Sequence, residues 1–159
     1  MTFITVFSSF NLITNYTNTE ESYILPKNQS ISDVPSNTQN LAICFYGNEL
    51  EQVHFSPSLS ELKVLLIGNE CFQKACNFVI DGLPNLECVI IGTKCFCIKS
   101  SSDDGICRIT NCPHLTKLRI CDRCFASFKS LELSNLNSLQ SITFGWNCFQ
   151  YTDFSLKGE

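Results

Sequence analysis

The dipeptide Cys-Phe recurs at a nearly constant spacing, and this period constrains the fold more than any other feature of the chain. In a regular context it starts at Cys71, Cys95, Cys124 and Cys148, so the intervals are 24, 29 and 24 residues. A unit of this length cannot bury its apolar face by itself, and it becomes stable only when neighbouring units stack on it. The period therefore predicts an array of stacked repeats.

Each unit contains two short apolar alternations. The first has the form Leu-x-x-[Leu/Val/Ile]-x-[Ile/Phe] and precedes Cys-Phe, whereas the second follows it and is closed by Gly or Asn. Residues two apart lie on the same side of a strand, so each alternation predicts a strand with one buried side. The first alternations begin at Leu62, Leu86, Leu115 and Leu139, and the second lie at 78–80, 107–109, 131–133 and 154–156.

The repeats divide the chain into a leader and an array. Residues 1–40 are predicted to be a largely irregular leader, because Ser, Thr and Asn fill 18 of these 40 positions. Residues 41–58 are predicted to form a degenerate cap repeat, since terminal repeats shield the end of the core. Four repeats follow at 59–82, 83–111, 112–135 and 136–158, and the second is lengthened by a polar insertion that we expect to be a loop.

Composition argues against several classes of protein. Apolar residues make up 44% of the chain and charged residues 16%, which favours a folded protein over a disordered one. The net charge of -4 and the lack of a basic stripe argue against nucleic-acid binding. No apolar run approaches the roughly 18 residues that a transmembrane helix needs. No clear signal peptide is present either, which slightly favours an intracellular location.

The chain has eleven cysteines, an odd number that cannot be fully paired within one molecule. The four of the Cys-Phe pairs share one repeat column, so we expect them to pack as small apolar side chains in the core. The alternative is a cysteine-rich metal-binding or redox-linked protein, because Cys121-x-x-Cys124 has the spacing of a zinc half-site. The residues of this alternative site are Cys95, Cys97, Cys121 and Cys124. A second CxxC is missing, so we predict no metal and no other cofactor.

The sequence shows no catalytic constellation. His54 lies between inward Val53 and Phe55 and is expected to point outward, and His114 lies in a turn after Pro113. Neither has a nearby arrangement of Ser and Asp that would form a triad. A Gly-rich phosphate loop is also lacking. We therefore predict that the protein is not an enzyme and has no catalytic residues.

The unit Leu-x-x-[Leu/Val/Ile]-x-[Ile/Phe]-Gly-x-x-Cys-Phe resembles the leucine-rich repeat over about residues 41–158. Its Ile-Gly step and its small-residue–Phe pair are most similar to the surface-antigen type of short repeat. The resemblance implies a β-rich, right-handed, horseshoe-like solenoid with two short strands per unit of about 24 residues and little helix. It also implies protein or ligand binding, often at a cell surface, and no chemistry.

One column departs from the family pattern. Leucine-rich repeats carry Asn or Cys nine positions into the unit, where its side chain bonds the backbone of a turn. In this sequence that column is Glu70, Lys94, Arg123 and Asn147, and the cysteine comes one position later. The departure puts an asparagine ladder of the usual kind in doubt.

The outward positions of the first strand predict a contact surface. The alternation places Val64, Leu66, Cys88 and Ile90 together on the solvent side, and Lys117 and Arg119 beside them. A contiguous apolar patch on an outward face is typical of an interaction site. The alternative is that the leader covers this patch through Phe3, Ile4, Val6 and Phe7.

We therefore expect a non-enzymatic module for protein–protein or ligand binding. The apolar edge of the last unit, around Phe144, Phe149 and Phe154, is expected to face water unless another repeat unit or another copy covers it. A longer array of which this chain is a fragment would supply such a unit.

Overall fold

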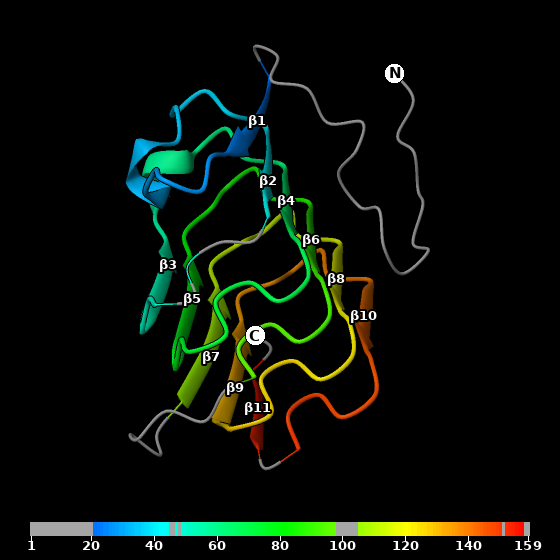
Figure 1. The fold of residues 1–159 in the computed structure, drawn as a ribbon. Helices are drawn as coiled ribbons and strands as arrows, with labels where there is room; N and C mark the ends of the chain where they lie inside the picture. The colour runs from blue at the N-terminus through cyan, green and yellow to red at the C-terminus, as the bar shows by residue number, and fades with distance from the viewer. Residues whose placement is uncertain (1–20, 45–46, 48, 98–104, 151, 158–159) are drawn as a thin grey trace.

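The computed structural model describes residues 21–44, 47, 49–97, 105–150 and 152–157. They form two parallel β-sheets that lie side by side (Figure 1). The six-stranded sheet has the order β1-β2-β4-β6-β8-β10, and the five-stranded sheet has the order β11-β9-β7-β5-β3. The strands are β1 (Ser22–Leu25), β2 (Asn40–Ile43), β3 (Gln52–Phe55), β4 (Val64–Ile67), β5 (Asn77–Asp81), β6 (Cys88–Ile91), β7 (Gly105–Thr110), β8 (Lys117–Ile120), β9 (Phe128–Ser134), β10 (Ser141–Phe144) and β11 (Asp153–Lys157).

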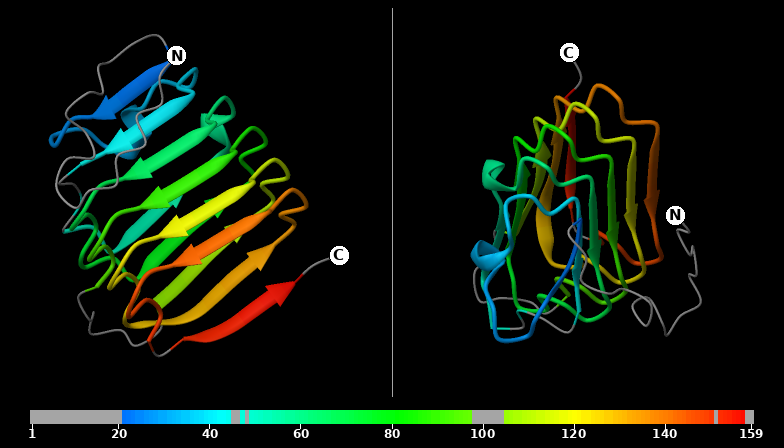
Figure 2. Two further views of the ribbon diagram at one scale, coloured as in Figure 1. Left: turned by 90° about the vertical axis from the view of Figure 1, so that its right-hand side faces the viewer. Right: turned by 90° about the horizontal axis from the view of Figure 1, so that it is seen from above.

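From β2 onward, successive strands belong alternately to the two sheets, so each unit contributes one strand to each sheet. Within the six-stranded sheet the units pair in register. Leu65 of β4, for example, lies between Leu41 of β2 and Val89 of β6. Equivalent positions of successive units therefore form straight columns across each sheet, which Figure 2 shows as strands of similar length aligned side by side.

The horseshoe-like solenoid of leucine-rich repeats expected from the sequence is wrong. A horseshoe needs units that are wider on one side, as when helices 8–10 Å apart lie behind strands about 4.8 Å apart. Here both sides of the units are parallel strands, and the helices of the described residues are two 3-10 turns, Ile31–Asp33 and Pro57–Leu59. Two sheets with the same strand spacing give neither side extra width, so the chain forms two parallel sheets side by side.

The core fills the space between the sheets with the inward columns of both. In β4 the inward residues Leu65 and Ile67 are buried, whereas the intervening Val64 and Leu66 are half-buried. The five-stranded sheet contributes buried positions such as Phe78 and Ile80 of β5. This alternation is the period-2 pattern that the sequence shows, and it decides which side chains can form a surface.

A column of phenylalanine rings runs through the core. Phe96 stacks on Phe125 with ring centroids 4.5 Å apart, and Phe125 stacks on Phe149 at 4.8 Å. Phe72 stacks on the other side of Phe96 at 5.6 Å. The backbone of these residues is left-handed, with φ of 54° at Phe125. That conformation costs an L-residue roughly 1–2 kcal/mol, which burial and stacking of the ring offset here.

Strand β1 lies within the segment that we expected to be largely irregular. It pairs in parallel with β2, with Tyr23 opposite Leu41 and Leu25 opposite Ile43. The short alternation of Tyr23 and Leu25 is the sequence signal that was missed. Residues 1–20 of the predicted leader lie outside the described residues, and so does the polar insertion of the second repeat up to residue 104.

Candidate binding surface

The structure brings all six residues of the predicted contact surface together on the outward face of the six-stranded sheet. Strand β4 carries Val64 and Leu66, and the neighbouring strands β6 and β8 continue the same two columns. The first column consists of Val64, Cys88 and Lys117, and the second column, next to it, consists of Leu66, Ile90 and Arg119. The left panel of Figure 2 views this sheet face on. We call these six residues the β4–β8 patch.

The β4–β8 patch is apolar at one end and basic at the other. Val64, Leu66, Cys88 and Ile90 are each half-buried, and Lys117 is exposed. Burial raises the pKa of the Cys88 thiol, although the positive charge of Lys117 acts in the opposite direction. At neutral pH Cys88 is therefore a neutral, weakly polar member of the apolar end.

The outward positions of the six-stranded sheet include no carboxylate among the residues that the structure describes. Two of them are basic, and both belong to β8. These outward positions are Ser22, Ile24, Asn40, Ala42, Val64, Leu66, Cys88, Ile90, Lys117, Arg119, Ser141 and Thr143. The exposed Glu87 lies directly before β6 and its negative charge also acts on Cys88, so charges of both signs adjoin the patch.

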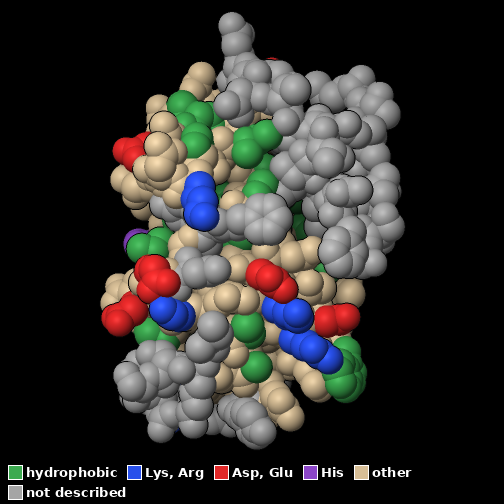
Figure 3. Space-filling view, viewed as in Figure 1, with side chains coloured by type: hydrophobic (Ala, Val, Ile, Leu, Met, Phe, Trp, Pro, Cys, Tyr) green, Lys and Arg blue, Asp and Glu red, His purple; other side chains and the backbone are tan. Residues whose placement is uncertain are grey.

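On the outward face of the five-stranded sheet, charged side chains have partners on the same face. Arg108 forms an ion pair with Glu132 of the next strand, with 2.9 Å between Nε and Oε2. Asp81 accepts hydrogen bonds from Asn111 at 2.7 Å and Thr110 at 2.8 Å, and these bonds lower its pKa. Acidic and basic side chains also lie next to one another on a different face of the molecule, the one seen in the direction of Figure 1 and drawn in Figure 3.

The leader residues that we considered as a cover for the patch, Phe3, Ile4, Val6 and Phe7, lie outside the described residues. That alternative stays a prediction.

The cysteines of the Cys-Phe pairs form one column, and each thiol donates a hydrogen bond to a carbonyl oxygen of the preceding unit. Cys95 Sγ lies 3.0 Å from the Gly68 oxygen, and Cys124 Sγ lies 2.9 Å from the Gly92 oxygen. Cys148 Sγ lies 2.8 Å from the Cys121 oxygen. Burial raises the pKa of Cys124 far above its ordinary value. These thiols therefore act as neutral donors in the core.

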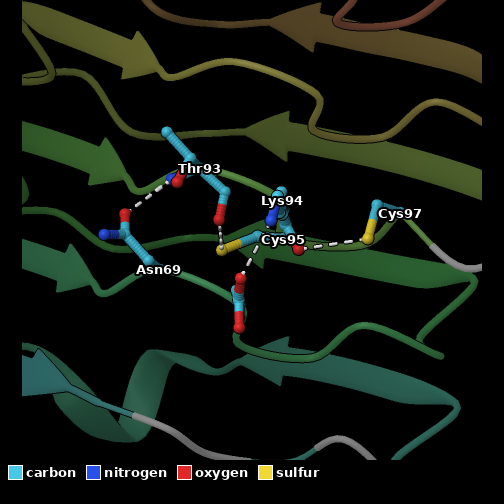
Figure 4. Close-up of polar contacts among 6 residues, drawn as sticks. Asn69, Thr93, Lys94, Cys95 and Cys97 are labelled. Atoms are coloured by element: carbon cyan, nitrogen blue, oxygen red, sulfur yellow. Dashed lines mark hydrogen bonds and ion pairs between the residues drawn. The ribbon is translucent and has the colours of Figure 1, made fainter. Parts of the chain in front are cut away.

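The alternative metal-site residues do not form a ligand cluster. Cys95 and Cys124 are buried in the thiol column, whereas Cys97 and Cys121 are half-buried and outside it. Figure 4 shows the Cys95 and Cys97 thiols directed at different carbonyl groups, and Cys97 donates to the Lys94 oxygen at 3.2 Å. Within the described part of the chain, no group of three or more His, Cys, Asp or Glu side chains is placed to hold a metal ion.

Side-chain acceptors also bond the turns, but one position earlier than the family column. Asn69 Oδ1 accepts from the Thr93 backbone N–H at 2.8 Å (Figure 4), and Asp122 Oδ1 accepts from the Trp146 N–H at 2.8 Å. The column of Glu70, Lys94, Arg123 and Asn147 instead adopts left-handed backbone, with φ between 56° and 59°. Sequence reasoning missed these acceptors, although an Asn or Asp directly before the left-handed residue was a readable signal.

The apolar edge of the last unit, at β10, was expected to face water, and the structure shows this for only some of its residues. Ile142, Phe144 and Trp146 are exposed, with 40%, 39% and 66% of their surface accessible. Phe149, expected to face water, is buried against Phe125 and Phe144. The side chain of Phe154 lies outside the description. Contact of this edge with another repeat unit or another copy stays a prediction.

The histidines lie on the surface, as the sequence indicates. His54 is exposed on β3, and the exposed His114 is within 2.6 Å of the Pro84 carbonyl oxygen through Nδ1. The resolved pKa shifts of described cysteines are all upward, whereas a nucleophilic cysteine needs a lowered pKa. The absence of enzymatic activity nevertheless stays a prediction.

No protein-family model, curated protein or solved structure gives a match to this chain. Membership of the leucine-rich-repeat family therefore stays a prediction that rests on the repeated residues. In the described residues, no helix has the length and apolar character needed to cross a membrane.

Proposed function

We propose that the protein is a non-enzymatic binding module that holds a protein partner on the β4–β8 patch. The observation that carries the proposal is the in-register alignment of four half-buried apolar side chains on two adjacent strands, with two basic side chains on the third. Contact with a partner would remove this apolar surface from water and thereby contribute to binding.

The geometry favours a binding role because the patch is pre-formed. Each of its strands is hydrogen-bonded within the sheet, and its side chains alternate with buried core residues such as Leu65 and Val89. A side chain held on a paired strand loses little additional freedom when a partner binds, which reduces the entropic cost of association. The patch also covers neighbouring strands instead of isolated positions.

The test uses a displayed library of random peptides selected on the whole chain. Clones enriched on the native protein are then measured on Leu66→Glu/Ile90→Glu, which places two carboxylates in the apolar end of the patch. We expect these clones to lose binding to the double variant. The matched control is Val79→Glu/Ile106→Glu, because both residues are half-buried at outward positions of the five-stranded sheet.

Urea unfolding of each variant confirms that it is folded. Binding that is lost on Leu66→Glu/Ile90→Glu and retained on Val79→Glu/Ile106→Glu supports the proposal. Enriched clones that bind all three proteins equally, or a library that yields no clone dependent on Leu66 and Ile90, would overturn it.

A further inference from the structure

The inward residues at the β10 end of the stack are only partly covered. Ile142 and Phe144 of β10 lie in register with Leu118 and Ile120 of β8, which are buried. Ile142 and Phe144 are instead 40% and 39% accessible, and Trp146, which follows β10, is 66% accessible. In the described part of the chain β10 is the last strand of its sheet, so a paired strand covers it on one side. We call Ile142, Phe144 and Trp146 the β10 edge.

The stacking of units within the chain shows what such an edge accepts. Each unit covers the next through in-register strands and stacked rings, as Phe125 does for Phe149 with centroids 4.8 Å apart. A matching surface must therefore present two β-layers at the same separation, with apolar side chains between them. A second end built from β10 and β11 has this construction, so the core of one copy can continue into the core of another.

The opposite end of the stack is covered within the chain. Leu25 of β1, and Val53 and Phe55 of β3, are buried although β1 and β3 are the terminal strands of their sheets. Val34, next to the 3-10 turn Ile31–Asp33, is buried in the same core cluster. A head-to-tail contact would need an open end at this position. Two copies therefore bury their exposed inward residues only by meeting through the β10 edge of each.

The charges of the last unit are compatible with such a contact. The third repeat, 112–135, has six charged residues, which are Lys117, Arg119, Asp122, Arg123, Lys129 and Glu132. Residues 136–158 have two, Asp153 and Lys157, and their charges cancel. A two-fold contact brings each charge of an interface near its own duplicate, so a charged end repels a second copy and a neutral end does not.

The surroundings of Trp146 are also neutral in sum. Its backbone N–H donates to Asp122 Oδ1 at 2.8 Å, and the Arg123 guanidinium carbon lies 5.5 Å from its ring centroid. Edge strands that stay exposed to water usually carry charged residues or proline, and residues 133–152 contain neither. The composition of this end is therefore typical of the core of an interface, which is depleted of charge.

We propose that the β10 edge binds the same edge of a second copy of this chain, which gives a two-fold symmetric dimer with Ile142, Phe144 and Trp146 buried between the copies. This inference concerns a different surface from the β4–β8 patch and does not depend on the proposed function.

The first test measures the mass and the tryptophan fluorescence of the whole chain over a range of concentrations. The experiments contain a reductant, so that disulfides between the eleven cysteines do not link copies. Sedimentation should show a species of twice the 17.9 kDa of one chain as the concentration rises. Trp146 is the single tryptophan of the sequence, so its emission should shift to shorter wavelength over the same concentrations as it becomes buried.

Charge variants then test the symmetry of the contact. Ile142→Lys and Ile142→Glu should each weaken self-association about tenfold or more, because a two-fold contact brings two like charges together. An equimolar mixture should associate at least about threefold more strongly than either variant alone, since the mixed dimer holds opposite charges. The matched control is Leu50→Lys, because Leu50 lies between β2 and β3 and is 39% accessible. This control should dimerise like the native chain.

Urea unfolding confirms that each variant is folded. If substitution of Ile142 prevents folding, Thr143→Lys and Thr143→Glu replace it, because Thr143 is exposed at an outward position of the same strand. Dimers that persist in the charge variants, species larger than a dimer, or a mixture that associates no better than its components would each contradict the symmetric contact. A chain that stays monomeric with unchanged Trp146 emission overturns the second copy and leaves the β10 edge to a repeat unit of another protein.

Discussion

Replacing Asn69 with Ala isolates one hydrogen bond between two consecutive units. Asn69 Oδ1 accepts from the Thr93 backbone N–H at 2.8 Å, and both residues are half-buried. The alanine removes the acceptor and leaves the N–H in a turn that water reaches only in part. A net hydrogen bond contributes about 0.5–1.5 kcal/mol, and an unsatisfied buried donor costs about 1–3 kcal/mol. We therefore expect Asn69→Ala to lower the free energy of unfolding by about 1–2 kcal/mol.

The control is Asn69→Asp, which keeps an acceptor oxygen at the same position. Asp122 makes the equivalent contact with the Trp146 N–H at 2.8 Å, so the turn accommodates a carboxylate. We expect Asn69→Asp to remain within about 0.5 kcal/mol of the native protein. Urea unfolding measures both variants, and the midpoint should shift without a change in the m-value. An aspartate variant as unstable as the alanine variant would refute the assignment of the stability to this bond.

Three further predictions test the turns and the buried thiols. Gly92→Ala should lower the free energy of unfolding by about 1–3 kcal/mol, because the new Cβ would lie 2.5 Å from Asn69 Oδ1 and 2.7 Å from Asn69 N. In the double variant with Asn69→Ala, urea unfolding should show a loss smaller than the sum of the two single losses. Lys94 is exposed with φ of 56°, so Lys94→Val should be about 1–2 kcal/mol less stable than Lys94→Gly in the same assay, and equal stabilities would argue against backbone strain. Burial raises the pKa of Cys107, so the unfolded chain loses this proton first and stability falls as pH rises above about 9. Cys107→Ala should make the fall between about pH 9 and 11 shallower, by up to about 1.4 kcal/mol per pH unit, and an unchanged slope would exclude this thiol as a source.

The sequence predicted which side chains face inward, but not how the units assemble. The alternation in β4 places Leu65 and Ile67 in the core and Val64 and Leu66 outward, because strand geometry alone determines this. The horseshoe shape came from the family resemblance and was wrong. The curvature of a repeat array depends on the relative widths of the two sides of each unit. The apolar alternation of one strand gives no information about these widths.

Alternation also cannot tell whether an inward side chain is covered. Ile142 and Phe144 of β10 follow the same pattern as Leu118 and Ile120 of β8, yet both are exposed while those of β8 are buried. Burial of an inward position requires a neighbouring unit on each side of the strand. The pattern therefore predicts direction, and the stack determines burial.

The turn contacts were the least predictable part of the candidate site region. Asn69 bonds a residue 24 positions further along the chain, so the contact exists only when two units stack in register. Its geometry also requires a neighbour without a side chain, as the short distances around Gly92 show. Spacing within one unit holds no information about such a contact.

In-register pairing converts sequence differences between units into gradients across a sheet. On the five-stranded sheet, equivalent positions of neighbouring units carry side chains of opposite charge, and Arg108 and Glu132 of adjacent strands form an ion pair. On the six-stranded sheet they run from Leu66 through Ile90 to Arg119, so apolar and basic side chains lie side by side. The same gradient therefore accounts for the location of the patch, because the apolar side chains of two adjacent strands fall next to one another only when the units pair in register.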